Sequence, residues 1–168
     1  MEAITVRDLL TAVGGTLIGP ETSLDRTVSS VDTDSRDIHP GSLFLPLVGE
    51  RFDGHTYIGS ALEAGAAGCL TAREPEHYQE GRFYIKVEDT QRALRDLAFW
   101  YKEQFRIPFV GVTGSVGKTT AKDMIASVLS AKYKVLKTEG NFNNNVGLPL
   151  TLLRLDRSVQ IGVVEMGM

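Results

Sequence analysis

The stretch GVTGSVGKTT, residues 111 to 120, combines residue types that bind phosphate. Gly114 and Gly117 can adopt backbone angles that other residues avoid, so main-chain N–H groups can point inward at an anion. Lys118 adds a positive charge for the β- and γ-phosphates of a nucleotide, and the Thr119 hydroxyl is a magnesium ligand. The sequence departs from the standard G-x-x-x-x-G-K-[ST] motif at one position, because residue 112 is valine where the motif has its first glycine.

The segments on both sides of this stretch favour phosphate binding over a glycine-rich turn with an incidental lysine. RIPFVGVTG is an apolar run that suits a strand buried on both faces of a parallel sheet. KTTAKDMIASVLSAKY predicts an amphipathic helix, whose free N–H groups and dipole attract anions. The residues expected to face inward are Met124, Ile125, Val128 and Leu129.

A carboxylate ends the last apolar run of the chain. Glu165 closes IGVVE, which predicts a strand, and YKVLKT predicts another strand before it. The carboxyl ends of parallel strands line the ligand crevice of such sheets. A glutamate after a strand is commonly a solvated surface residue, but together with the phosphate loop it predicts a magnesium site formed with Thr119.

Further polar stretches leave two interpretations open. In DTDSRD, Ser35 can hydrogen-bond a uracil edge and Arg36 or Arg51 suits a pyrophosphate, yet the stretch also fits a solvated turn. His55 fits the start of a helix or a functional site. The tract NFNNN offers the amides of Asn141 and Asn144 to phosphate or sugar, or is only a polar loop before a short helix in GLPLTLLRL.

The elements before the phosphate loop alternate between strands and helices, which predicts an α/β fold. TVRDLLTAVGG predicts a helix capped by Thr5 and stopped by Gly14, and HTYIGSALEAGA predicts a second helix ending at Gly65. DTQRALRDLAFWYKEQF predicts a third, amphipathic helix. The stretches that predict strands here are TVSSVDTDSR, GSLFLPLVGE, GCLTA and RFYIKV. We expect a domain boundary near Glu88.

Composition places the chain among globular proteins. It has 168 residues, 42% of them hydrophobic and 23% charged, and a formal net charge of -3. That charge gives no support for nucleic-acid binding, which needs a basic stripe. Cys69 is a single cysteine in an apolar stretch, which predicts a buried residue. The start lacks a signal-peptide pattern and no run is long enough to span a bilayer, so we expect a cytoplasmic protein.

Several separated motifs resemble the Mur ligases, which build the peptide of bacterial peptidoglycan. They are TGSVGKTT followed by AKDM, EGNFNNNVGLPLTLLRL, VVEMGM, and DTDSRDIHPGSLFLPLVGERFDGHTYIGSALEAGAAG. In that family the loop is spelled T-G-[ST]-x-G-K-[ST], which accounts for the displaced glycine. The resemblance covers essentially the whole chain. It implies a small N-terminal α/β uridine-nucleotide-binding domain over 1–88, then the start of a P-loop-type central domain with a mostly parallel sheet over 89–168.

The resemblance favours the dipeptide-adding member and implies an ATP-dependent amide ligase that uses magnesium. Its substrates would be UDP-N-acetylmuramoyl-tripeptide and D-alanyl-D-alanine, joined through an acyl phosphate. Lys118 would be catalytic and would bind ATP together with Gly114, Ser115, Val116, Gly117, Thr119 and Thr120. Thr119 and Glu165 would hold magnesium. The substrate-binding residues would be Asp34, Ser35, Arg36, Glu50, Arg51, Phe52, Asp53, Gly54, His55, Asn141 and Asn144.

Mur ligases are much longer than this chain, so we expect a fragment that binds the UDP-linked peptide without turning it over. The complete protein is expected to be a monomer without membrane insertion. Two alternatives remain open: another Mur-type ligase, such as the tripeptide-forming one, and a stand-alone nucleotide-binding module without catalysis.

Overall fold

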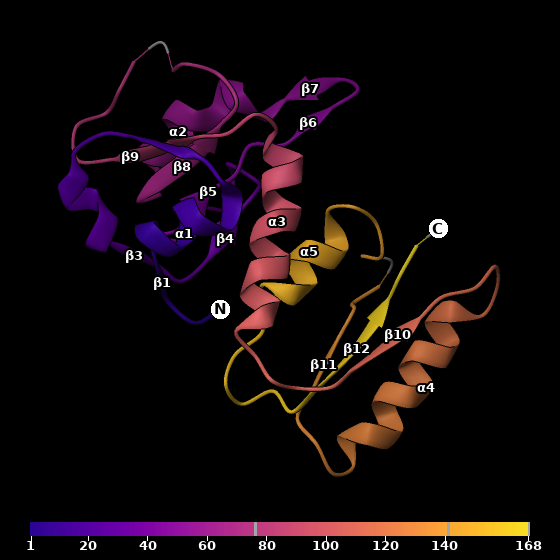
Figure 1. Cartoon of the computed structure of the whole chain (residues 1–168). Coiled ribbons are helices and arrows are strands. Elements are labelled where there is room, and N and C mark those ends of the chain that lie inside the picture. The colour runs from indigo at the N-terminus through magenta and orange to yellow at the C-terminus, as the bar shows by residue number, and fades with distance from the viewer. Residues whose placement is uncertain (76, 141, 168) are drawn as a thin grey trace. The chain divides into compact units, whose positions relative to one another are not determined.

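The computed structural model describes residues 1–75, 77–140 and 142–167, and the chain divides into two compact units (Figure 1). Unit 1 comprises Met1–Glu2 and Ala98–Met168, and unit 2 comprises Ala3–Leu97. The division falls inside helix α3 (Thr90–Glu103). The sequence predicted this helix, with the expected domain boundary just before it, near Glu88. Each unit carries a sheet of its own, so the α/β class predicted from the sequence is confirmed.

Unit 2 is built on a five-stranded sheet. In spatial order its strands are β2 (Thr16–Ile18), β9 (Phe83–Lys86), β8 (Gly68–Thr71), β5 (Leu43–Phe44) and β4 (Val31–Asp32). Neighbouring strands run parallel except for β2, which pairs antiparallel with β9. Helix α2 (Ile58–Glu63) packs Ala61 and Leu62 against Phe44, Cys69 and Tyr84 in the core. Cys69 is fully buried, as predicted.

Helix α1 (Val6–Val13) begins and ends at the residues that the sequence predicted. The Thr5 hydroxyl accepts a hydrogen bond from the Asp8 N–H at 3.1 Å, and the Asp8 carboxylate accepts one from the Thr5 N–H at 2.9 Å. This reciprocal pair is a capping box. Gly14 ends the helix with a φ of 62°, a left-handed conformation that favours glycine.

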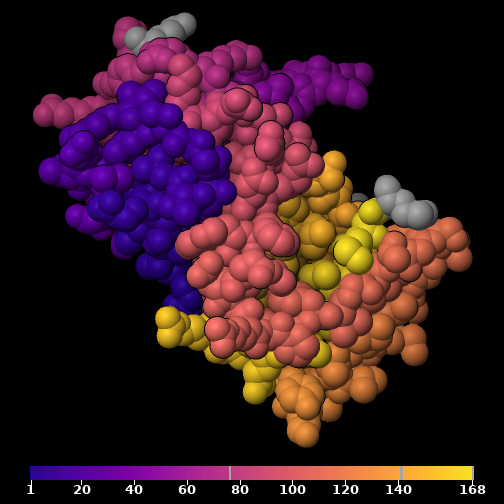
Figure 2. Space-filling model, viewed as in Figure 1, coloured from indigo at the N-terminus to yellow at the C-terminus, as the bar shows by residue number. Residues whose placement is uncertain are grey.

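Short elements complete unit 2. The strand pair β6 (Val48–Gly49) and β7 (Phe52–Asp53) forms an antiparallel hairpin that stands out from the body of this unit (Figures 1 and 2). The remaining elements are β1 (Ile4–Thr5), β3 (Thr27–Val28), which pairs with β1, and the 3-10 helices η1 (Glu21–Asp25) and η2 (Gly54–Tyr57).

Unit 1 carries a parallel three-stranded sheet with β12 in its centre. The spatial order is β10 (Phe109–Val112), β12 (Ile161–Glu165) and β11 (Val135–Lys137). Helix α4 (Lys118–Ser130) packs on this sheet, and α5 (Gly147–Leu152) precedes β12 (Figure 1). The prediction that β10 is buried on both faces was wrong. It lies at the edge of the described sheet and is half-buried, whereas the central strand β12 is buried.

The inward face of α4 agrees with the prediction only in part, because Ile125 and Leu129 are half-buried but the other two predicted residues are exposed. Met124 is 65% exposed and Val128 is 75% exposed, while Lys122 and Ala126 are the buried residues of this helix. A helix on a three-stranded sheet buries a narrow stripe, and hydrophobicity alone did not identify which stripe faces the strands. None of the described helices is long and apolar enough to cross a membrane.

Candidate functional site

The predicted phosphate loop leaves β10 at Val112 and enters α4 at Lys118. Gly114 has a φ of 144° and Gly117 a φ of 75°, so both positions favour glycine. Gly117 is the N-cap of α4 and has no side chain to cap the helix, which leaves its first N–H groups available to an anion. The strand–loop–helix context predicted from the sequence is therefore present. Ser115, Val116 and Thr120 are exposed on the loop and the first turn.

The side chain of Lys118 lies across its own loop. Its Nζ donates a hydrogen bond to the Gly114 carbonyl oxygen at 2.6 Å. A phosphate oxygen carries a full negative charge and binds an ammonium group more strongly than a neutral carbonyl does. A polyphosphate on this loop would therefore compete with Gly114 for the ammonium group.

Glu165 faces the start of α4 from the end of β12. β10 and β12 are parallel, and their register sets Val112 beside Glu165, so the loop and the carboxylate lie at the same edge of the sheet. The Thr119 hydroxyl donates a hydrogen bond to Glu165 Oε2 at 2.9 Å. Glu165 is 2% exposed. The structure thus brings together the two residues predicted to hold magnesium.

The asparagine tract contributes a residue that the sequence analysis did not single out. Asn143 Nδ2 donates a hydrogen bond to Glu165 Oε1 at 2.7 Å, so both carboxylate oxygens are engaged. The Asn144 Oδ1 accepts from the N–H groups of Val146 and Gly147 at 3.1 and 2.8 Å, which caps the start of α5. Asn141 lies outside the described residues. The asparagine-rich sequence indicated that this segment could be functional, but it did not indicate which asparagine contacts Glu165.

The donor set around Glu165 fits a magnesium ion. Magnesium prefers oxygen ligands and is bound through one or two carboxylates and hydroxyls together with phosphates and water. A hydroxyl oxygen and a carboxylate oxygen lie 2.9 Å apart here, beside the phosphate loop. Among the described residues no group of three or more histidine, cysteine or acidic side chains could hold a metal without such further ligands.

In unit 2, the predicted uridine-site residues Asp34, Ser35 and Arg36 occupy a turn after β4. The guanidinium of Arg36 binds both oxygens of the Asp34 carboxylate, with distances of 2.9 and 2.6 Å. These bonds, together with the Arg36 N–H, lower the pKa of Asp34 to about 2. The guanidinium is 87% exposed, and Ser35 is half-buried between the two charged residues.

The predicted residues Glu50, Arg51 and Phe52 lie at the tip of the β6–β7 hairpin. All three are exposed, and the Phe52 side chain is 58% exposed. A Cβ atom on Gly49 would overlap the Phe52 ring across the hairpin, so the glycine lets the ring pack close to the backbone. The hairpin presents an aromatic surface and two opposite charges to solvent.

Asp53 and His55 form a tight hydrogen-bonded network behind the hairpin. The Asp53 carboxylate accepts from the His55 N–H at 3.0 Å and pairs with His55 Nδ1 and with the Arg73 guanidinium, each at 2.7 Å. His55 Nε2 accepts from the Ala72 N–H at 3.0 Å, so the proton of the neutral ring is on Nδ1. These contacts lower the pKa of Asp53, and the hydrogen bond from the His55 N–H contributes most. Gly54 is buried between the two residues.

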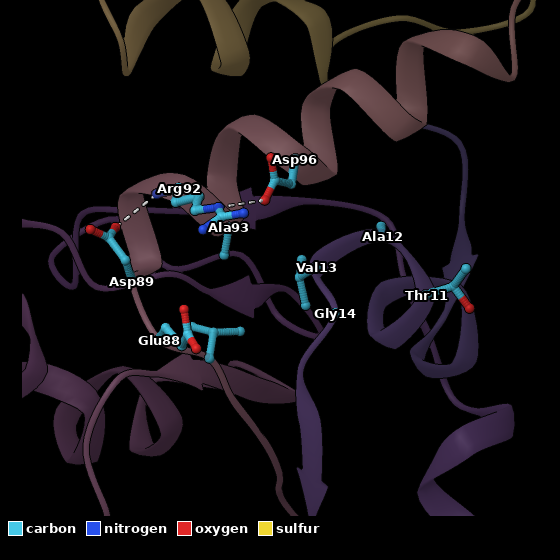
Figure 3. Close-up of a pocket in the computed structure, with 10 residues that line it drawn as sticks. Thr11, Ala12, Val13, Gly14, Glu88, Asp89, Arg92, Ala93 and Asp96 are labelled. Carbon is cyan, nitrogen blue, oxygen red and sulfur yellow. Dashed lines mark hydrogen bonds and ion pairs between the residues drawn. The ribbon is translucent and has the colours of Figure 1, made fainter.

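A separate hollow of about 440 Å³ in unit 2 lies between the end of α1 and the start of α3 (Figure 3). Glu88, Asp89 and Asp96 line it together with one cation, Arg92. The Arg92 N–H donates to Asp89 at 2.8 Å, and the Arg92 guanidinium lies 3.6 Å from Asp96. Three carboxylates against one guanidinium leave the hollow negative, so it is unsuited to a polyphosphate.

Comparisons with known proteins agree with these observations. The family model described as the catalytic domain of the Mur ligase family matches residues 27–101, and that of the Mur ligase middle domain matches residues 112–168. The UDP-N-acetylmuramoyl-tripeptide–D-alanyl-D-alanine ligase of Bacillus subtilis is 46% identical to this chain. The matched region covers 98% of this chain and 36% of that relative.

Solved structures show the same similarity. MurF from Acinetobacter baumannii superposes with a TM-score of 0.90 at 34% identity, covering 100% of this chain and 36% of that one. MurF ligase from Thermotoga maritima in complex with ADP superposes with a TM-score of 0.74 at 36% identity, covering 82% of this chain and 31% of that one. The chain therefore spans about a third of the length of these relatives.

Proposed function

This chain belongs to the Mur ligase family, and on that premise we propose that it is part of an ATP-dependent amide ligase of peptidoglycan precursor synthesis. The ligase joins D-alanyl-D-alanine to UDP-N-acetylmuramoyl-tripeptide. The γ-phosphate of ATP passes to the terminal carboxylate of the tripeptide, giving an acyl phosphate and ADP. The amine of D-alanyl-D-alanine then attacks the acyl carbon, an amide bond forms, and phosphate leaves. The reaction for which the Bacillus subtilis relative is named supports this choice of substrates.

One observation carries the proposal: the Thr119 hydroxyl and the Glu165 carboxylate meet at 2.9 Å beside the loop that holds Lys118. The two residues are 46 positions apart in the sequence, and neither needs the other to complete its own secondary-structure element. An oxygen pair next to a glycine-rich loop and a helix N-terminus is the arrangement that binds a magnesium-complexed nucleotide. ATP and magnesium are therefore the proposed nucleotide and metal.

The residues of this chain would act mainly through charge. A phosphoryl group and a carboxylate repel each other, and transfer between them needs positive charge on the phosphate oxygens. Lys118 supplies one such charge, and the N–H groups of Gly114 to Thr120 supply oriented dipoles. Magnesium, when bound by Thr119 and Glu165, would neutralise further negative charge on the nucleotide. Because Lys118 would contact the transferred phosphoryl group, we propose it as the catalytic residue.

We assign the UDP-linked substrate to residues 1–88 and the start of the ATP-binding domain to residues 89–168. In the first region, the Asp34–Arg36 turn, the hairpin tip and the Asp53–His55 network offer guanidinium groups and an exposed aromatic ring. Such groups suit a pyrophosphate and a uracil. Asn141 and Asn144 remain proposed contacts from the second region. A cytoplasmic, monomeric ligase fits substrates that are small and water-soluble.

The test has two parts. For the 168-residue chain, calorimetric titrations with ADP plus magnesium and with UDP-N-acetylmuramoyl-tripeptide are expected to show binding of each ligand without turnover. For the full-length protein, ADP release is expected to require both the UDP-linked tripeptide and D-alanyl-D-alanine.

Each alternative predicts a different result in that assay. ADP release that requires a UDP-linked dipeptide and a free diamino acid would identify a tripeptide-forming ligase. Nucleotide binding without release for any acceptor would identify a binding module. Turnover by the 168-residue chain alone would contradict the proposed division of the site.

A further inference from the structure

Helix α4 buries a cation that the proposed chemistry does not use. The Lys122 side chain is 1% exposed, and its Nζ donates a hydrogen bond to the Thr138 carbonyl oxygen at 2.7 Å. The ammonium lies 3.4 Å from the Asp123 carboxylate, which binds the half-exposed Lys137 at the shorter distance of 2.8 Å. Burying an ammonium is unfavourable unless it is well paired, and an apolar side chain would fill the same space at lower cost. The position of this cation therefore calls for a reason other than packing.

The partner of Lys122 connects it to the proposed metal ligand. Thr138 follows β11 and is fully buried. Its hydroxyl oxygen accepts a hydrogen bond from the Glu165 N–H at 3.0 Å, and its own N–H donates to the Val163 carbonyl at 3.1 Å. Thr138 thus links the end of β11 to the end of β12, at the residue whose carboxylate faces Thr119.

These contacts close a ring that begins and ends on α4. Thr119 binds the Glu165 carboxylate, the Glu165 N–H binds Thr138, and Thr138 accepts from Lys122. Thr119 and Lys122 are three residues apart and lie on the same face of the helix. The first two turns of α4 are therefore tied to Glu165 at two points, directly from Thr119 and through Thr138 from Lys122. Two ties fix the separation of the Thr119 and Glu165 oxygens better than one does.

We propose that Lys122 is a positioning residue that holds Glu165 at the proposed magnesium site through Thr138. The inference rests on the proposed function, because it assumes that Thr119 and Glu165 bind magnesium together with a nucleotide. It assigns Lys122 no contact with the nucleotide. Its effect is confined to the geometry of the metal ligands, and this separates it from a residue that only stabilises the fold.

The test compares Lys122→Met with Lys137→Met in the 168-residue chain. Lys137→Met is the matched control because it removes the other ammonium that pairs with Asp123 but leaves Thr138 untouched. ADP affinity is measured by calorimetry, once with magnesium and once with EDTA, and the ratio of the two affinities gives the gain due to magnesium. Loss of an outer partner of a metal ligand lowers metal affinity about 10- to 100-fold.

We expect the magnesium-dependent gain to fall about tenfold in Lys122→Met, the lower end of this range, because Lys122 reaches Glu165 only through Thr138. Little change is expected in EDTA, and Lys137→Met is expected to keep the wild-type gain. Thr138→Val, which removes the hydroxyl that accepts from Glu165 but keeps the carbonyl, is expected to lower the gain in the same way. If Lys122→Met does not fold, a wild-type gain in Thr138→Val still overturns the inference, because Lys122 reaches Glu165 only through Thr138.

Three results would overturn the inference. If the variants keep the wild-type gain, or lose affinity equally with and without magnesium, Lys122 serves only the fold and the proposed magnesium site stands. If the wild-type chain binds ADP without any gain from magnesium, the magnesium site of the proposed function fails, and this inference fails with it.

Discussion

Gly54→Ala is expected to destabilise unit 2 although it adds a single methyl group. A Cβ atom at this buried position would lie 2.7 Å from the carbonyl oxygen of Leu47 and 2.8 Å from its nitrogen. Ordinary contact begins at 3.4 Å, so the two backbone segments must separate by about 0.7 Å, the difference between 3.4 and 2.7 Å. The Gly54 N–H donates to the same Leu47 oxygen at 2.8 Å, and this bond would be strained by the separation.

Two costs set the size of the effect. Inserting a methyl group where backbone atoms cannot move freely costs about 1–3 kcal/mol, and weakening one hydrogen bond costs about 0.5–1.5 kcal/mol. A loss of about 1.5–4.5 kcal/mol in the free energy of unfolding follows. For a unit of this size, each kcal/mol corresponds to about 4–8 °C, so the unfolding temperature should fall by about 6–36 °C.

Gly59→Ala is the matched control, measured by differential scanning calorimetry beside Gly54→Ala. Gly59 lies in α2, and a Cβ atom there meets nothing within 4 Å. Because alanine favours helix over glycine by about 0.5–1 kcal/mol, this variant should unfold at a slightly higher temperature than the wild type. If Gly54→Ala unfolded at the wild-type temperature or above it, the close approach of Leu47 to Gly54 would be wrong. The orientation of Asp53 and His55, which flank this glycine, would then be wrong too.

Three further predictions concern ionisable groups. The pKa of Asp34 should be about 2 by NMR titration, and Arg36→Ala should return it toward 3.8 because the guanidinium is the main cause of the lowering. An unchanged Asp34 pKa in Arg36→Ala would contradict the pairing of Asp34 with Arg36. Folding lowers the pKa of Asp53. Its ionised form therefore stabilises the fold at pH values above the unfolded pKa of 3.8, and this stabilisation is lost as the pH falls through the lower pKa of the folded state. Asp53→Asn should therefore flatten the acid side of a plot of unfolding temperature against pH. Burial raises the pKa of the Cys69 thiol to about 12, so iodoacetamide at mildly alkaline pH should label it only after denaturation, and rapid labelling of the native chain would contradict its burial.

The phosphate loop and the ends of α1 could be predicted from the sequence because their signals are local. Gly114, Gly117 and Lys118 lie within five residues, and the capping box of Thr5 with Asp8 spans four. Each feature depends on the backbone conformation of its own segment. The meeting of the phosphate loop and Glu165 was also predicted, because strands that end at the same edge of a parallel sheet bring their last residues together. Val112, which precedes the loop, lies beside Glu165 in the register.

Features set by long-range packing were not predictable in the same way. Asn143 binds Glu165 across 22 positions and Lys122 binds Thr138 across 16, and neither partner is marked by its residue type. Hydrophobicity placed Met124 and Val128 inward on α4, but the stripe that faces the sheet carries Lys122. Which stripe is buried depends on the position of the strands, and this information is absent from the helix sequence itself.

Lys118→Ala tests whether the amides and the ammonium of the phosphate loop bind the polyphosphate of a nucleotide. The measurement is the affinity of the 168-residue chain for ADP with magnesium, compared with Lys132→Ala, which removes a lysine beyond the end of the same helix. Loss of a charge-assisted hydrogen bond should weaken binding about 10- to 100-fold in Lys118→Ala and leave the Lys132→Ala affinity unchanged. Equal affinity of Lys118→Ala and the wild-type chain would contradict such binding.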